Sequence, residues 1–175
     1  DAALWNAPPT QAVLITTDSL IDTVHFRTDW TTWRDLGWKA LAVNISDIAA
    51  MGGNPKVATV SLALTGNELV TDLVKLYRGM GTIARSEGMV IAGGDIVRAP
   101  HDFGIHVTVL GNTRRSGLLT RGGARPGDLI AVTGTLGAAA AGLALLQLPE
   151  SDPRRRATTA PLLIEAHTRP QPRVQ

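Results

Sequence analysis

The chain of 175 residues contains no cysteine, and its seven aromatic residues make up only 4% of the sequence. Without cysteine, disulfide frameworks, zinc fingers, iron–sulfur sites and thiol nucleophiles are all excluded. No uninterrupted apolar run reaches the roughly 20 residues that a membrane-spanning helix needs. A basic-then-apolar leader is also absent from the sequence. We therefore expect a cytoplasmic protein that has no membrane partner.

Charge is nearly balanced, with 17 lysines and arginines against 15 aspartates and glutamates. The last 25 residues hold five arginines and two acids, so the positive excess lies in this tail and the remaining body is close to neutral. A nucleic-acid-binding protein typically shows a basic face with interleaved aromatic residues, which this body lacks. We expect no nucleic-acid partner, whereas a phosphorylated substrate held by a few arginines or by a cation is compatible with the sequence.

The hydrophobic fraction of 44% supplies enough apolar material for one packed domain. Short β-branched runs predict strands at 12–17, 21–26, 56–64, 89–92, 103–110 and 129–133. Apolar residues at helical spacing predict helices over 33–51, 68–86 and 136–147, and a short one at 161–167. This mixture indicates an α+β (mixed α/β) fold, with helices packed on a sheet. From Pro149 onward the composition changes, so we predict a domain at 1–148 and, at 149–175, a linker and the start of a truncated second domain.

The predicted helix over 33–51 is almost wholly apolar around Asp47, and Asn44 lies one turn earlier on the same face. We therefore expect Asp47 to be buried, and a buried carboxylate is costly unless a partner compensates its charge. Two interpretations are equally supported by the residues. Asp47 is either a core aspartate that caps nearby backbone or a metal ligand.

Further oxygen ligands stand where predicted strands end. The segment Thr16-Thr17-Asp18 closes the first strand, and Gly93-Gly94-Asp95 follows a later one. Ordinary turns would explain both positions as well. Asp1 adds a fourth carboxylate at the first residue of the chain. Together with the lack of cysteine, these carboxylates favour hard oxygen coordination of Mg²⁺, which points toward nucleotide chemistry.

Familiar catalytic motifs are absent from the sequence. It has no Gly-x-x-x-x-Gly-Lys-Ser/Thr phosphate loop, no kinase glycine-rich loop and no Gly-x-Ser-x-Gly nucleophile elbow. On the residues alone, we interpret His25 as a strand-edge histidine and Tyr77 as a half-buried core residue. Arg121 is equally well explained as a solvated loop charge.

Several segments together resemble the thiamine-monophosphate kinase family, which belongs to the superfamily of aminoimidazole ribonucleotide synthetase and selenophosphate synthetase. The more specific matches are the block from Leu36 to Gly52 and the triplet Val24-His25-Phe26; the others are Asp1-Ala2-Ala3, the stretch from Thr16 to Leu20, Gly93-Gly94-Asp95 and the stretch from Arg121 to Asp128. The resemblance implies an N-terminal domain of the aminoimidazole ribonucleotide synthetase type, which pairs through its sheet in a homodimer.

The resemblance also implies ATP-dependent phosphorylation of thiamine monophosphate to thiamine diphosphate, assisted by Mg²⁺. By match, the metal ligands would be Asp1, Thr16, Thr17, Asp18, Asp47 and Asp95. ATP would be contacted by Tyr77, Gly94, Asp95 and Arg121, and the substrate phosphate by His25. No catalytic residue is assigned, because the acceptor phosphate is already ionised. The second half of the family's chain is missing here. The alternatives are therefore another ATP-dependent enzyme of the superfamily (selenophosphate synthetase-like or hydrogenase-maturation-like) and a non-catalytic dimerising remnant.

Overall fold

The computed structural model describes residue 8 and residues 10–174. Strand β1 (Gln11–Ile21) is followed by α1 (Trp33–Ala50), β2 (Asn54–Leu64), α2 (Val70–Ser86), β3 (Val90–Arg98) and β4 (Gly104–Arg114). The remaining elements are the short 3-10 helices η1 (Arg115–Gly117) and η2 (Pro153–Arg156) and the helices α3 (Ala138–Leu146) and α4 (Ala160–Thr168). The predicted mixed α/β fold is confirmed.

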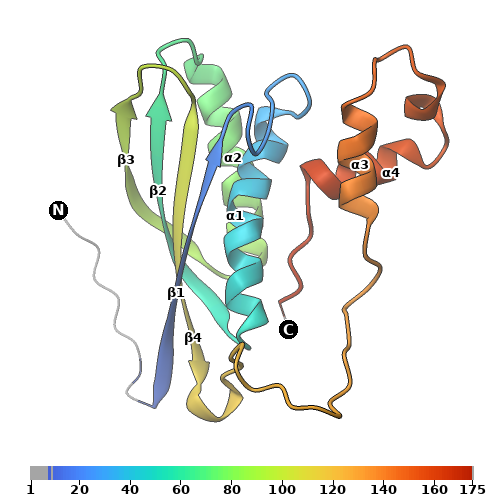
Figure 1. Ribbon diagram of the computed structural model, residues 1–175. Helices are drawn as coiled ribbons and strands as arrows, with labels where there is room; N and C mark the ends of the chain where they lie inside the picture. Colours follow the sequence, from blue (N-terminus) through green and yellow to red (C-terminus); the bar gives the residue numbers. More distant parts are fainter. Residues whose placement is uncertain (1–7, 9, 175) are drawn as a thin grey trace.

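The four strands form one sheet in the order β1-β4-β2-β3, so β1 and β3 are its two edges. Strand β4 runs antiparallel to both of its neighbours, whereas β2 and β3 are parallel. Helices α1 and α2 both cover the same face of this sheet (Figure 1). The opposite face, here called the open face, is covered by none of the described helices (Figure 1).

The core lies between the sheet and the two helices, where Leu41, Ile45 and Val60 are completely buried. The helices cross closely because glycine stands at both contact points. A Cβ atom at Gly37 would collide with the carbonyl oxygen of Leu76, and one at Gly79 would collide with the backbone of α1. Helix α1 begins as predicted, with the Thr32 hydroxyl accepting the Asp35 N–H at 3.0 Å.

Three predictions about strands are wrong. Ile21 ends β1, and residues 23–25 form a turn in which Thr23 has a φ of 64°. The stretch 129–133 forms no strand, and its Leu129 and Ile130 are 97% and 98% exposed. Strand β3 does not stop at Ala92, because its pairing with β2 continues to Arg98. Asp95 therefore lies inside a strand rather than behind its end.

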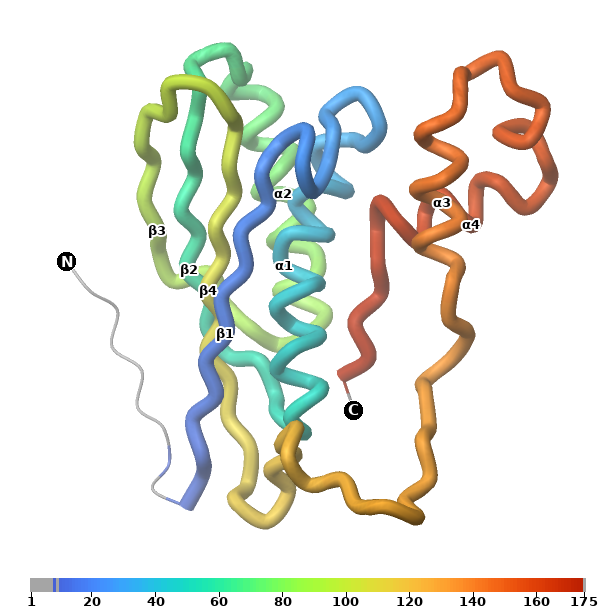
Figure 2. Tube along the Cα trace, viewed as in Figure 1, coloured from blue at the N-terminus to red at the C-terminus, as the bar shows by residue number. Residues whose placement is uncertain are grey.

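After β4 the chain runs along one end of the domain to α3, which packs against α4 (Figure 2). The final residues then return beside α1, where Trp38 Nε1 donates to the carbonyl oxygen of Pro170 at 2.7 Å. The guanidinium of Arg169 lies 4.4 Å from the centre of the Trp38 ring. The predicted short helix at 161–167 is confirmed as α4, and the domain boundary after residue 148 stays a prediction. None of the helices in the described part of the chain has the length and apolarity to cross a membrane.

Candidate functional site

An oxygen-rich cluster lies where the edge strand β1 runs beside α1. The hydroxyl of Thr16 donates to Asp47 Oδ2 at 2.8 Å. Asp18 lies two residues further along the same face of β1. Burial and the negative charge of Asp47 raise the pKa of Asp18 above its usual value, while His25 lowers it. Because the two carboxylates repel each other, a cation between them would be stabilised.

The expectation that Asp47 is buried is wrong, because its side chain is exposed. Helix α1 turns Asp47 toward the edge strand of the sheet, whereas Asn44 faces the core. Asn44 is fully buried, and its Nδ2 donates to the carbonyl oxygen of Ala40 at 3.1 Å. An exposed carboxylate does not carry the cost that the core interpretation had to explain. The exposed position instead allows the Asp47 carboxylate to bind a ligand, such as a cation, from solvent.

His25 is held in a defined tautomer by the turn after β1. The backbone N–H of Ile21 donates to His25 Nδ1 at 3.1 Å. A ring nitrogen that accepts a hydrogen bond carries no proton, so the neutral imidazole has its proton on Nε2. The exposed His25 side chain can therefore offer Nε2–H to an anion. Its role in binding a substrate phosphate stays a prediction.

Within a single chain, the predicted metal ligands do not all lie close together. Thr17 lies on the open face, where its hydroxyl donates to the carbonyl oxygen of Val107 at 3.1 Å. Asp95 lies on β3, the opposite edge from β1, and is paired with Ser61. Two strands separate these edges, which places β3 roughly 14 Å from β1 at the usual strand spacing. Within the described residues no three histidine or acidic side chains form a group that could hold a metal.

A cavity of about 770 Å³ lies between α2 and the β3 edge. It is lined by Arg34, Val70, Leu73, Val74, Tyr77, Arg78, Gly81, Thr82, Arg85 and Ile96. We call it the α2 groove. Tyr77 is half-buried there, and burial raises the pKa of its phenol. Ile96 follows Asp95 directly, so the groove adjoins the glycine-rich part of β3. Sequence reasoning missed the arginines, although Arg78 and Arg85 are two helical turns apart on α2.

The remaining predicted site residues are Gly94, Arg121 and Asp1. Gly94 pairs with Val60, and a Cβ atom there would collide with the Val60 carbonyl oxygen, so β3 can approach β2 only with glycine at this position. Arg121 is exposed in the segment after η1. Asp1 lies outside the described residues.

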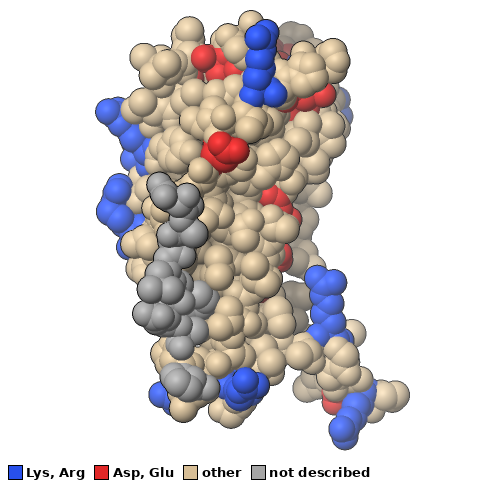
Figure 3. Space-filling model, turned by 90° about the vertical axis from the view of Figure 1, so that its left-hand side faces the viewer, with Lys and Arg blue, Asp and Glu red and all other residues tan. Residues whose placement is uncertain are grey.

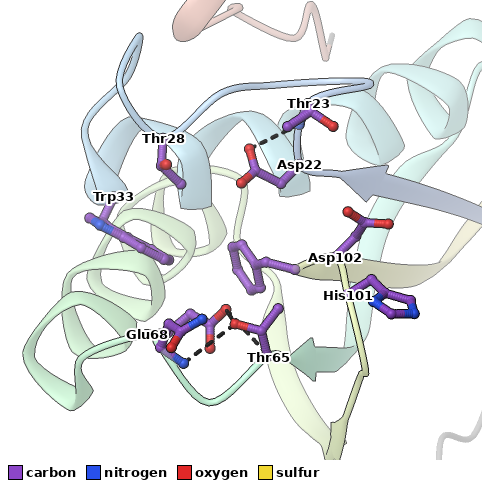
Figure 4. Close-up of a pocket in the computed structure, with 10 residues that line it drawn as sticks. Asp22, Thr23, Thr28, Trp33, Thr65, Glu68, His101 and Asp102 are labelled. Atoms are coloured by element: carbon purple, nitrogen blue, oxygen red, sulfur yellow. Dashed lines mark hydrogen bonds between the residues drawn. The ribbon is translucent and has the colours of Figure 1, made fainter.

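A second cavity, of about 360 Å³, opens among the loops at one end of the sheet (Figure 4). Its acidic side chains include Asp22, Glu68 and Asp102. Glu68 accepts a hydrogen bond from the Thr65 hydroxyl at 2.8 Å, and Asp22 accepts one from the N–H of Thr23 at 2.9 Å. Glu68 and Asp22 therefore stabilise their own turns. None of the predicted site residues lines this cavity.

Comparison with known proteins bears on this arrangement. The family described as AIR synthase related protein, N-terminal domain, matches residues 1–113. The chain belongs to this family. Membership in the AIR synthase related family confirms the fold type that the sequence motifs implied.

Two curated relatives are named thiamine-monophosphate kinase. The protein of Bacillus subtilis is 40% identical over 174 residues, which cover 99% of this chain and 53% of the relative. That of Escherichia coli K12 is 41% identical over 187 residues, which cover 99% of this chain and 52% of the relative. The solved structure of AaThiL complexed with AMPPCP and TMP has a TM-score of 0.85 and 36% identity, covering 96% of this chain and 52% of that one. The chain thus spans about half the length of these proteins.

Proposed function

We propose that this chain is the N-terminal half of a thiamine-monophosphate kinase, which transfers a phosphoryl group from ATP to thiamine monophosphate. The observation that carries the proposal is the cluster of Thr16, Asp18 and Asp47, in which the Thr16 hydroxyl binds Asp47 and the charge of Asp47 acts on Asp18. The names of the relatives, and the AMPPCP and TMP in the AaThiL structure, support the choice of substrates. A cytoplasmic location without nucleic-acid or membrane partners belongs to the same proposal.

The donor set of this cluster fits Mg²⁺, which prefers carboxylate and other oxygen ligands. Asp18 and Asp47 would hold the ion, with Thr16 beside them. When bound, the ion would offset the negative charge of the phosphates that must approach each other. His25 would donate Nε2–H to the acceptor phosphate and orient it. The attacking oxygen is already ionised, so phosphoryl transfer needs positioning and charge neutralisation rather than a strong general base.

The α2 groove is the proposed place for the nucleoside of ATP. Its volume of about 770 Å³ is sufficient for a nucleotide, and Tyr77 and the apolar side chains offer surface for a base. The adjoining Gly93 has open space where a side chain would be, so a ligand can approach the backbone of β3 there. Asp95 directly precedes Ile96 of the groove lining and is proposed as a further ATP contact. Arg121 is proposed as a further ATP contact on the resemblance alone.

A second copy of the chain would complete the site. Asp95 and the β1 cluster lie at opposite edges of the sheet, too far apart to share an ion within one chain. The open face carries Val13 and Ile15, which are 51% and 71% exposed. Seen from that side, much of the surface that the structure describes is uncharged; a few acidic side chains lie on it, and lysines and arginines lie toward its margins (Figure 3). Two such faces packed together would cover this apolar surface and could bring Asp95 of one protomer to β1 of its partner.

The test is an assay of the protein extended to the full length of its relatives. The purified protein is incubated with ATP, Mg²⁺ and thiamine monophosphate, and thiamine diphosphate is measured by chromatography. We expect product formation that depends on all three components. A folded, complete protein that forms no product would overturn the proposal and favour another superfamily activity or a non-catalytic remnant.

A further inference from the structure

Lys39 is a half-buried cation to which the proposed function assigns no role. It lies on α1, and its Nζ donates to the carbonyl oxygen of His25 at 3.3 Å. It forms no salt bridge with any residue in the described ranges. Burial lowers the pKa of Lys39 below its usual value. An ammonium that is half removed from water and bonded to a carbonyl group alone is incompletely compensated, and it would be stabilised by an anion.

Two further basic residues line the surface beside Lys39. With Arg27 and His167, Lys39 lines a small cleft between α1, the turn after β1, and α4. Burial lowers the pKa of His167, and the positive charge of Lys39 in the same cleft lowers it further. Arg27 is already paired with the Asp29 carboxylate at 2.8 Å, so an anion near this junction would be attracted mainly by the lysine.

The charge of the side chains therefore changes sign along the contact between β1 and α1, here called the seam. Asp47 and Asp18 form its negative part, and His25 is near enough to Asp18 to lower its pKa. Lys39 donates to the backbone carbonyl oxygen of His25. A phosphate that accepts a phosphoryl group needs cation-bearing carboxylates on one side and N–H donors on the other. The seam provides both.

We propose that Lys39 is a second binding group for the acceptor phosphate and acts beside His25. The proposal rests on the proposed function for the identity of the molecule that carries the phosphate. The preference for an anion follows from the lysine and the imidazole themselves. A purely structural explanation also exists, since the bond to the His25 carbonyl oxygen ties the turn that contains Thr23 to α1.

The first experiment measures turnover of the full-length protein and separates the two substrates. Lys39→Met is expected to raise the KM for thiamine monophosphate about tenfold or more, because a charge contact to phosphate is lost, while the KM for ATP stays constant. Lys39→Arg should recover most of the affinity. Lys75→Met is the matched control, because Lys75 is an exposed lysine on α2 paired with Asp72. An unchanged KM for the acceptor in folded Lys39→Met would overturn the proposal.

The second experiment does not depend on turnover. Inorganic phosphate is titrated into the full-length protein, and the ring resonances of His25 are followed by NMR. We expect saturable shifts in the wild type, at least tenfold weaker binding in Lys39→Met and near-normal binding in Lys39→Arg. Shifts of equal affinity in all variants, or none in the folded wild type, would contradict the role of Lys39. If the protein binds phosphate in this manner but makes no thiamine diphosphate, the proposed function fails while the anion site stands.

Discussion

Thr16 and Asp47 join the edge strand to the first helix through a single side-chain hydrogen bond of 2.8 Å. The bond connects residues that are 31 positions apart in the chain. It holds the Asp47 carboxylate beside Asp18, where the negative charge raises the pKa of its neighbour. This hydrogen bond makes Asp47 part of a charged cluster, although the helix around it is apolar.

Replacing Asp47 with asparagine tests this cluster. The amide can still accept the Thr16 hydroxyl, but it removes the charge that would hold a cation. We expect turnover of the full-length protein to fall by at least about 100-fold, because charge neutralisation is the main contribution to phosphoryl transfer. The free energy of unfolding should change by less than about 1 kcal/mol, because the side chain is exposed. Ser46→Ala, at the neighbouring exposed position, is the control. Near-normal turnover in Asp47→Asn would contradict the assignment as a metal ligand.

Asp18→Asn should stabilise the metal-free protein at pH 7. Burial and the repulsion from Asp47 raise the pKa of Asp18 in the folded state, so the folded protein binds its proton more tightly than the unfolded chain does. The stability contributed by this group is present below the unfolded pKa and is lost as the pH rises through the folded one. The gain from the amide should therefore appear at pH 7 and shrink toward pH 3.5. Solvent screening keeps it below about 1 kcal/mol.

Urea unfolding of wild type and Asp18→Asn at these two pH values, in the presence of a chelator, provides the measurement. Addition of Mg²⁺ at pH 7 should stabilise the wild type more than the variant. A variant that is less stable than the wild type at pH 7 without metal would contradict the repulsion inferred for Asp18.

Gly94 and Gly93 provide a matched pair on β3. A Cβ atom at position 94 would collide with the backbone of Val60, whereas one at position 93 would meet open space. We expect Gly94→Ala to destabilise the fold by about 2 kcal/mol or more, because β3 must shift away from β2. Gly93→Ala should change stability by about 0.5 kcal/mol or less. Thermal unfolding of both variants, monitored by circular dichroism, distinguishes them; equal stability would show that Gly94 is not required for strand pairing.

The proposed dimer depends on the open face. Ile15→Arg should leave the fold intact, because this side chain is 71% exposed in the single chain, but it should prevent two open faces from packing. Sedimentation velocity is expected to show dimers for the wild type and monomers for the variant. Leu162→Arg, at a 68% exposed position on α4, should remain dimeric. A wild type that sediments as a monomer at tens of micromolar would rule out this interface as a stable contact.

The sequence predicted the helices better than the turns and the strand ends. The spacing of Leu76, Met80 and Ile83 located α2, because a helix that covers a sheet must bury one stripe of side chains. The alternation in 21–26 resembles a strand, yet Thr23 adopts a left-handed conformation and Ile21 bonds to the His25 ring. Such local hydrogen bonds leave no periodic signal in the sequence.

The candidate site was only partly predictable for a related reason. Matching motifs identified Thr16, Asp18 and Asp47, and these residues do gather. The position of Asp95 at the opposite edge depends on strand order, which long-range pairing decides and which no local pattern reveals. The half-buried state of Lys39 depends likewise on α4 and on the turn after β1, both of which are remote from it in sequence.

The most direct test of the central claim, a phosphoryl-transfer site shared between two copies, is a complementation assay with full-length Asp47→Asn and Asp95→Asn. Each variant alone should be inactive. When equal amounts are mixed and allowed to exchange, half of the dimers combine both variants, and in each of these one site keeps both aspartates. We predict recovery of about a quarter of the wild-type thiamine-monophosphate kinase activity. No recovery, in a mixture shown to contain mixed dimers, would place Asp47 and Asp95 in the same protomer's site and contradict the shared arrangement.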